Sequence, residues 1–132
     1  MIAKVLIEKD GNGYSAVITN FQSTIWGSGD SVKEAKADLM NSIEEVRQSY
    51  LESGEESPDN LEDISFEYKY DVSALFNAFS FLNTSKFAER IGISPSLMRH
   101  YKAGGTYISD TQAKKIEAGL HQIAQELLAV SL

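Results

Sequence analysis

Apolar and polar residues alternate along the first 19 residues of the chain. Ala3, Val5 and Ile7 share one face of the segment 2–9, the pattern of a half-buried strand. Residues 10–13 read Asp-Gly-Asn-Gly, a hairpin signal because Gly and Asn tolerate positive φ. The pattern predicts strands over 2–9 and 14–19. A third is expected over 23–26, with the Gly-Ser-Gly of 27–29 as a turn into a helix.

The spacing of apolar residues then changes to steps of three and four. Ser31 and Glu34 form a capping box, which opens a helix that we expect to end near Gly54. Its apolar face comprises Val32, Ala35, Leu39, Ile43, Val46 and Tyr50. A polar loop over 55–60 follows, and residues 64–70 alternate again as a strand. Residues 1–71 are therefore predicted to form a β-β-β-α-β domain.

From residue 72 the pattern is helical throughout, which places a domain boundary at 71/72. Residues 72–82 are short and very apolar, suited to a scaffold helix behind the following segment. Residues 84–103 have the spacing of a helix-turn-helix. Ala88 is small enough for a close helix crossing, and Gly92 can take the left-handed conformation that ends a helix. Ser94 and Pro95 then suit the start of a second helix. The expected fold class is α+β, with an all-α domain over 72–132.

The last helix begins at a second capping box, Ser109 to Gln112. Apolar residues then follow the a/d spacing of a helix–helix seam: Ala113, Ile116, Leu120, Ile123, Leu127 and Val130. This seam either packs on the helix-turn-helix of its own chain or joins two chains. We favour a homodimer or higher homo-oligomer, because the helix is longer than a small bundle needs.

Charge is divided unevenly along the 132 residues, whose net charge is −7. Residues 1–71 carry six Lys/Arg against fifteen Asp/Glu, whereas residues 72–132 carry six against four. This asymmetry indicates two different partners, although an acidic surface can also serve solubility alone. Cys is absent, which excludes disulfides and thiolate metal sites. No apolar run approaches the ~20 residues that span a bilayer, and no signal peptide is evident, so we expect a cytoplasmic protein.

The second helix of a helix-turn-helix usually enters the major groove of DNA. Arg99 is placed to contact guanine, and His100 and Ser96 could donate to bases or phosphates. The complete set of expected DNA contacts is Ser94, Pro95, Ser96, Arg99, His100, Lys102, Lys86, Arg90, Lys114 and Lys115. Arg90 and the four lysines among them are expected to contact phosphates. The alternative is that these charges are solvated residues of a bundle that contacts protein.

Other chemistry has little support. His100 and His121 lie on different predicted helices, so we expect no metal and no cofactor. Catalysis by paired metals would require convergent carboxylates. The candidates are Glu8, Asp10, Asp30, Glu34 and Asp38. Asp10 is explained by the hairpin, and Asp30 and Glu34 by the helix N-terminus. We therefore expect no enzyme and no catalytic residues.

Two short motifs and their order carry a family resemblance. The hairpin Gly-Asn-Gly-Tyr of 11–14 is followed, after two more strands, by Gly-x-Gly-Asp-Ser-x-x-Glu-Ala over 27–35 at the start of a helix. With the β-β-β-α-β order and a C-terminal helix-turn-helix, the chain resembles the HicB antitoxins of type II toxin–antitoxin systems, over nearly its whole length. The resemblance implies a truncated ribonuclease-H-like N-terminal domain.

The resemblance also implies a function. The N-terminal domain would neutralise a small basic ribonuclease toxin of the HicA type. The C-terminal domain would bind double-stranded operator DNA and repress the chain's own operon. Two alternatives stay open: a free-standing transcriptional regulator without a toxin, and a metal-dependent nuclease.

Overall fold

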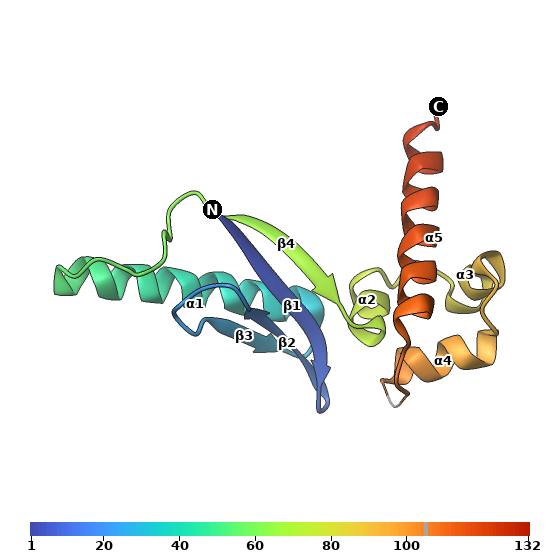
Figure 1. Ribbon diagram of the computed structural model, residues 1–132, viewed down its shortest axis with the longest axis horizontal. Coiled ribbons are helices and arrows are strands. Elements are labelled where there is room, and N and C mark those ends of the chain that lie inside the picture. The colour runs from blue at the N-terminus through green and yellow to red at the C-terminus, as the bar shows by residue number, and fades with distance from the viewer. Residues whose placement is uncertain (105) are drawn as a thin grey trace. The chain divides into compact units, whose positions relative to one another are not determined.

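The computed structural model describes residues 1–104 and 106–132 of a mixed α+β chain (Figure 1). The chain divides into two compact units, Met1–Phe79 and Ser80–Leu132. Each unit has its own buried residues and is described separately.

The first unit contains a four-stranded sheet in the order β3-β2-β1-β4. Its strands are β1 (Ile2–Asp10), β2 (Gly13–Ile18), β3 (Trp26–Gly29) and β4 (Ser65–Tyr70). Antiparallel pairing joins β1 to β2 and β2 to β3, whereas β4 runs parallel to β1. The expected β-β-β-α-β order is confirmed, followed by one further helix.

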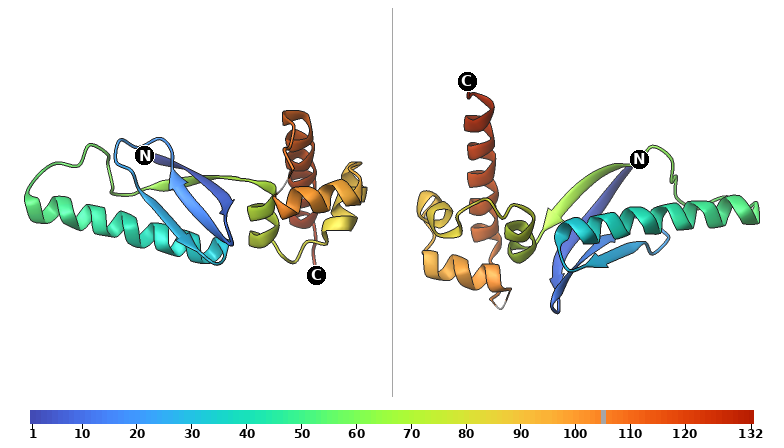
Figure 2. Two further views of the ribbon diagram at one scale, coloured as in Figure 1. Left: turned by 90° about the horizontal axis from the view of Figure 1, so that it is seen from below. Right: turned by 180° about the vertical axis from the view of Figure 1, so that it is seen from behind.

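Helix α1 (Val32–Ser53) lies across one face of this sheet (Figure 2). Its capping box forms as expected, because the Ser31 hydroxyl accepts the Glu34 N–H and Glu34 accepts the Asp30 N–H. Gly54 ends the helix in the left-handed conformation. The core beneath α1 joins alternate residues of β1 and β2 to one face of the helix: Ala3, Val5, Ile7, Ala16, Ile18, Val32, Ala35, Leu39 and Ile43. Ile25, Leu61 and Ala74, which lie outside these elements, complete it.

The third strand lies later in the sequence than expected, and it contains the glycines that were expected to form a turn. A Cβ atom on Gly27 would lie 2.2 Å from the backbone nitrogen of Leu39, and one on Gly29 would lie 2.4 Å from the Cβ of Glu34. Glycine is therefore required because α1 packs directly against the backbone of β3. Ser23 stays outside the strand, since its N–H is bound by the buried carboxylate of Asp59.

The helix expected to support the helix-turn-helix belongs to the first unit instead. Helix α2 (Val72–Ala78) packs against β1, β4 and α1. Asp71 accepts hydrogen bonds from the N–H groups of Ala74 and Lys9, and Asn77 accepts one from the N–H of Val32. The expected boundary at 71/72 is thus wrong by one helix, and the units divide after Phe79.

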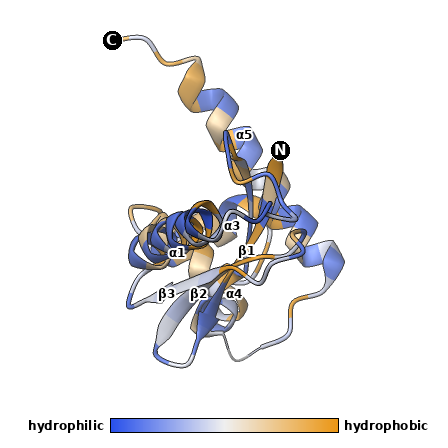
Figure 3. Ribbon diagram, turned by 90° about the vertical axis from the view of Figure 1, so that its left-hand side faces the viewer, coloured by the Kyte–Doolittle hydropathy of each residue, from blue (hydrophilic) through white to orange (hydrophobic). Residues whose placement is uncertain are grey.

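The second unit consists of α3 (Thr84–Ile91), α4 (Pro95–Ala103) and α5 (Asp110–Leu128). Helices α3 and α4 pack together, and α5 packs on α3. Buried residues from all three helices and the α3–α4 turn form the core of the unit: Phe87, Ala88, Ile93, Met98, Tyr101 and Ile116. Apolar residues also occur near the C-terminal end of α5, where they are exposed (Figure 3).

Candidate functional site

The turn between α3 and α4 has the local geometry that the sequence predicts. Gly92 is left-handed, with φ of +77°, and its N–H donates to the carbonyls of Ala88 and Glu89. The Ser94 hydroxyl accepts the Leu97 N–H at 3.3 Å, and Pro95 is the first residue of α4. Ala88 is fully buried, so a larger residue would separate the two helices.

One face of α4 is buried and the opposite face is open. Met98 and Tyr101 point into the core. Four of the residues of this helix that were expected to contact DNA are exposed: Ser96, Arg99, His100 and Lys102. Ala103 is exposed beside them. Pro95 is half-buried, and Ser94 is exposed but serves as the helix cap.

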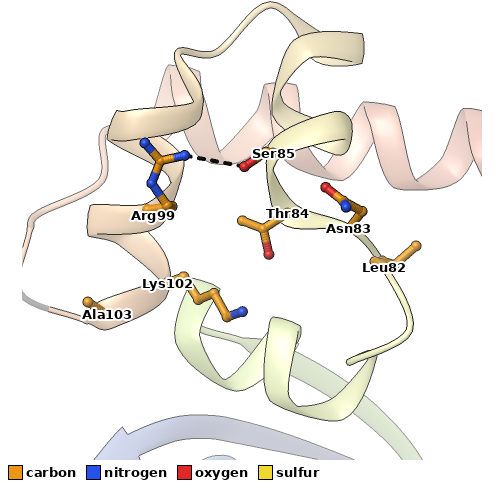
Figure 4. Close-up of a pocket in the computed structure, with 7 residues that line it drawn as sticks. All are labelled: Leu82, Asn83, Thr84, Ser85, Arg99, Lys102 and Ala103. Carbon is orange, nitrogen blue, oxygen red and sulfur yellow. Dashed lines mark hydrogen bonds between the residues drawn. The ribbon is translucent and has the colours of Figure 1, made fainter.

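A hollow of about 630 Å³ separates the C-terminal half of α4 from the start of α3 (Figure 4). Arg99 and Lys102 line it from α4, and Thr84 and Ser85 line it from the first turn of α3. The remaining lining residues are Leu82, Asn83 and Ala103. The hollow thus brings two cations, two hydroxyls and a helix N-terminus together.

The electrostatics of this hollow favour an anion. The N-terminus of a helix carries a partial positive charge and N–H groups that lack partners within the helix. In α3 the Asn83 side chain accepts the Lys86 N–H at 2.9 Å. The Arg99 Nη1 donates to the Ser85 hydroxyl at 3.3 Å, which holds the guanidinium beside the start of α3. Arg, Lys and helix N-termini are the groups with which proteins bind phosphate.

The sequence interpretation missed Asn83, Thr84 and Ser85 as members of the site. Asn83 could have indicated the start of the helix, because Asn is a favoured N-cap residue. The expected segment began at Thr84, so the cap at Asn83 lay just outside it.

The other expected phosphate contacts do not gather at this hollow. Arg90 is ion-paired with Glu126 of α5, which ties it to the packing of the unit instead. Lys86 is exposed and lines a separate small hollow beside Phe87 and Ile123. Lys114 and Lys115 are exposed near the start of α5. They do not line the hollow between α3 and α4.

The seam expected along α5 separates into two stripes. Gly119 and Ile123 face α3, and a Cβ on Gly119 would lie 2.4 Å from the Cγ2 of Ile91. Ile116 shares their side of the helix, three and seven residues earlier. Ile116 is 4% exposed, so it is already buried within its own unit and cannot join an interface between chains.

The second stripe lies beside the first, since Leu120, Ala124 and Leu127 recur at steps of four and three. Leu127 is 63% exposed and the adjacent Leu128 is 86% exposed. Two other residues of the expected seam belong to neither stripe. Ala113 is exposed one turn before Ile116, and Val130 lies beyond the end of α5.

Two of the carboxylates considered for catalysis, Asp38 and Glu34, have structural partners in the first unit. Asp38 accepts the Ser28 N–H at 2.9 Å, and Glu34 accepts the Asp30 N–H. Among residues 1–104 and 106–132, no group of three or more His, Cys, Asp or Glu side chains is placed to hold a metal ion. Within the same residues, no helix has the length and apolar character needed to cross a membrane.

Acidic residues gather at the far end of α1 and in the loop that follows it. Residues 44–63 carry eight Asp/Glu and one Arg. That Arg47 donates to Glu44 at 2.6 Å and to Glu62 at 3.4 Å. The hydrogen bonds from Arg47 and then from Gln48 lower the pKa of Glu44 to about 2. Leu51 on the same half of α1 is 62% exposed.

Comparisons of the chain with protein-family models, curated proteins and solved structures gave no match.

Proposed function

We propose that the chain is a DNA-binding repressor in which α3 and α4 act as a helix-turn-helix. The observation that carries the proposal is the convergence of Arg99 and Lys102 with the N-terminus of α3. A phosphate of the DNA backbone fits this hollow, because it would receive charge-assisted hydrogen bonds from both side chains and from the start of the helix.

A phosphate held there would place the open face of α4 toward the major groove. Ser96, His100 and Arg99 would then approach the base edges. The Arg guanidinium has five N–H donors, so Arg99 can keep its bond to Ser85 while another edge contacts guanine. Lys102 would contact the backbone and contribute affinity without sequence preference.

Dimerisation through the second stripe of α5 completes this proposal. Residues 118–132 carry a single charged residue, Glu126, which is paired with Arg90 of the same chain. Exposed leucines on a helix with so little charge resemble the core of a protein interface, where charged residues are depleted. A two-fold dimer would present two copies of α4 to half-sites about one turn of DNA apart.

The first unit is proposed to bind a small basic protein. Residues 1–79 have a net charge of −9, and the acidic end of α1 carries most of it. The order of the strands and α1 supports a HicB-type domain, and a HicA-type ribonuclease toxin is the corresponding partner. The function proposed for the whole chain is therefore antitoxin and autorepressor.

A gel-shift assay tests the DNA-binding part. The full chain is titrated against the DNA immediately upstream of its own gene at two salt concentrations, with scrambled competitor. Specific retention that weakens with salt is expected, because bound phosphates release counterions. Equal retention of the scrambled DNA, or none of either, would refute a specific repressor.

The toxin-binding part needs a separate test. A small basic reading frame beside the gene is expressed with and without this chain, and cell growth is followed. Growth arrest that co-expression relieves supports the antitoxin. Arrest that persists in the presence of the folded chain would remove this half of the proposal and leave the repressor.

A further inference from the structure

Strand β4 forms one margin of the sheet, with β1 on its inner side and no strand beyond it in residues 1–104 or 106–132 (Figure 1). Free edges are templates for pairing with another chain, and proteins often block them with Pro, bulges or charge. The strand Ser65–Tyr70 contains no Pro and pairs with β1 in continuous register. Lys69 supplies its only positive charge.

The direction of the outer backbone groups follows from the hydrogen bonds at the two ends of β4. Ser65 N–H donates to the Met1 carbonyl at 3.0 Å, and Asp71 N–H donates to the Ile7 carbonyl at 2.9 Å. Odd-numbered residues therefore face β1. Because backbone groups alternate along a strand, the N–H and C=O of Phe66, Tyr68 and Tyr70 point toward the free edge.

We propose that β4 of a second copy of this chain pairs here, antiparallel and centred on Tyr68. Each Tyr68 would exchange both hydrogen bonds with its counterpart, and Phe66 would do the same with Tyr70 of the second copy. Only outward-facing residues would be hydrogen-bonded, as an antiparallel ladder requires. A shift of one residue would set outward-facing groups against inward-facing groups.

Charge selects this register over its nearest competitors. Centring on Tyr68 puts Glu67 opposite Lys69 of the other copy, twice by symmetry. Centring on Glu67 would oppose two Glu residues, and centring on Lys69 would oppose two Lys residues. Opposite charges stabilise a cross-strand pair and like charges destabilise it. The strand Phe-Glu-Tyr-Lys-Tyr is thus complementary to itself when reversed.

The aromatic side chains of β4 support the same occupant. Phe66, Tyr68 and Tyr70 are half-buried on the face that α1 occupies, but α1 packs mainly over β2 and β3. Phe66 and Tyr68 stack with ring centroids 6.0 Å apart. Lys36 of α1 packs on this row of aromatic rings, with its Nζ 4.0 Å from the Tyr68 ring centroid and 2.6 Å from the Tyr70 hydroxyl. The second copy would extend this row of rings with its own Phe66, Tyr68 and Tyr70.

Electrostatics also favours a second copy at this edge. Two units of net charge −9 repel each other over most of their surface, whereas Glu67 and Lys69 make this strand neutral. A basic protein would gain little from a neutral strand. The inference concerns the first unit alone, so it goes beyond the proposed repressor and does not depend on DNA binding.

Charge exchange provides the test. The mass of the full chain is measured by sedimentation equilibrium for the original sequence, Lys69→Glu, and the double variant Glu67→Lys with Lys69→Glu. Lys69→Glu should halve the mass, because it sets a second carboxylate opposite Glu67 across the axis. The double variant should restore it. Lys33→Glu, the same charge reversal at an exposed position of α1 outside the strand pair, is the matched control and should leave the mass unchanged.

Association through α5 could obscure this change in mass. The same series is therefore repeated in chains that also carry Leu127→Glu, which disrupts the α5 interface. On that background the same halving and restoration are expected between a dimer and a monomer. An unchanged mass in Lys69→Glu on both backgrounds, or failure of the double variant to restore it, would overturn the proposal. Circular dichroism on each variant confirms that the sheet is folded.

Cross-linking tests the register directly, since the chain has no Cys. Chains carrying Glu67→Cys and Lys69→Cys are equilibrated together and oxidised. These positions would face each other as a non-hydrogen-bonded pair with Cα atoms about 4.5 Å apart, within the range of a disulfide. The mixture should give a covalent pair, and either variant alone should give far less. Equal cross-linking in the single-variant samples would refute the register.

Discussion

The Arg99 guanidinium on α4 donates a hydrogen bond to the Ser85 hydroxyl on α3, with 3.3 Å between Nη1 and Oγ. This bond holds a cation from the second helix beside the N-terminus of the first. It makes the hollow between the helices a property of the pair and not of either helix alone.

Substitutions in the hollow should separate specific from general DNA affinity. Arg99→Ala should cost about 1–3 kcal/mol on the specific site and relax the preference at one base. Lys102→Ala should weaken all sequences about equally and reduce the salt slope by about 1. Gel shifts over a salt series measure both effects. Lys4→Ala, an exposed Lys of the first unit, is the control, and a similar loss in that variant would contradict the assignment.

The exposed stripe of α5 should control assembly and DNA affinity together. Leu127→Glu places a charge in the proposed interface, so the mass should fall and specific DNA should be bound more weakly. The side chain is exposed, and the thermal stability of the second unit should change little. Sedimentation equilibrium and gel shifts on the same sample check the coupling. Gln122→Glu, also exposed on α5 but on the opposite side from Leu127, should leave the mass unchanged.

Gly27→Ala should unfold the first unit or destabilise it severely. The added Cβ would lie 2.2 Å from the backbone nitrogen of Leu39, and a helix backbone cannot move aside as a side chain can. The cost should exceed the ~1–3 kcal/mol of ordinary overpacking. Urea denaturation followed by circular dichroism measures it. Ser28→Ala at the neighbouring exposed position should be nearly neutral, and equal loss in both variants would contradict the close packing of α1.

Asp59→Ala should destabilise the first unit by about 1–3 kcal/mol for each N–H that loses its acceptor. The carboxylate is 4% exposed and accepts the Gln22 N–H at 2.9 Å and the Ser23 N–H at 3.0 Å. Asp59→Asn retains one oxygen and should lose less. Denaturation midpoints provide the comparison, with Glu56→Ala as an exposed control in the same loop. No difference between Asp59→Ala and this control would contradict the role of the two hydrogen bonds.

The stabilising effect of Glu44 should depend on pH in a defined direction. Hydrogen bonds from Arg47 and Gln48 lower the pKa of Glu44 from 4.5 to about 2 in the folded chain. Its contribution is therefore present above pH 4.5 and is lost as the pH falls toward 2. The melting temperature of Glu44→Gln should be slightly below that of the original chain at neutral pH and converge with it in strong acid. Glu45→Gln controls for the loss of a carboxylate, and a gap that widens at low pH would contradict the mechanism.

Local signals predicted most of the secondary structure. The cap at Ser31, the left-handed Gly92 and the start of α4 at Pro95 follow from the chemistry of one or a few adjacent residues. Such signals do not depend on the rest of the fold. They placed the exposed face of α4 correctly as well.

Long-range packing was responsible for the errors. Gly27 and Gly29 were interpreted as a turn because glycine often forms turns, whereas here the close approach of α1 requires them. The position of α2 depends on Asn77 binding the Val32 N–H, 45 residues away in the sequence. The division of the α5 seam likewise depends on which residues α3 covers, and periodicity alone does not determine that.

The placement of α2 limits how this chain can exchange modules. A gene fusion at residue 72 would remove the acceptor of the Val32 N–H and the residues that close the end of the sheet, so the remaining part would fold poorly. A fusion after Phe79 would keep the sheet unit whole and allow a different C-terminal unit to be attached. Recombination in nature and engineering in the laboratory would meet the same constraint, and viable junctions should concentrate at the start of the segment 80–83.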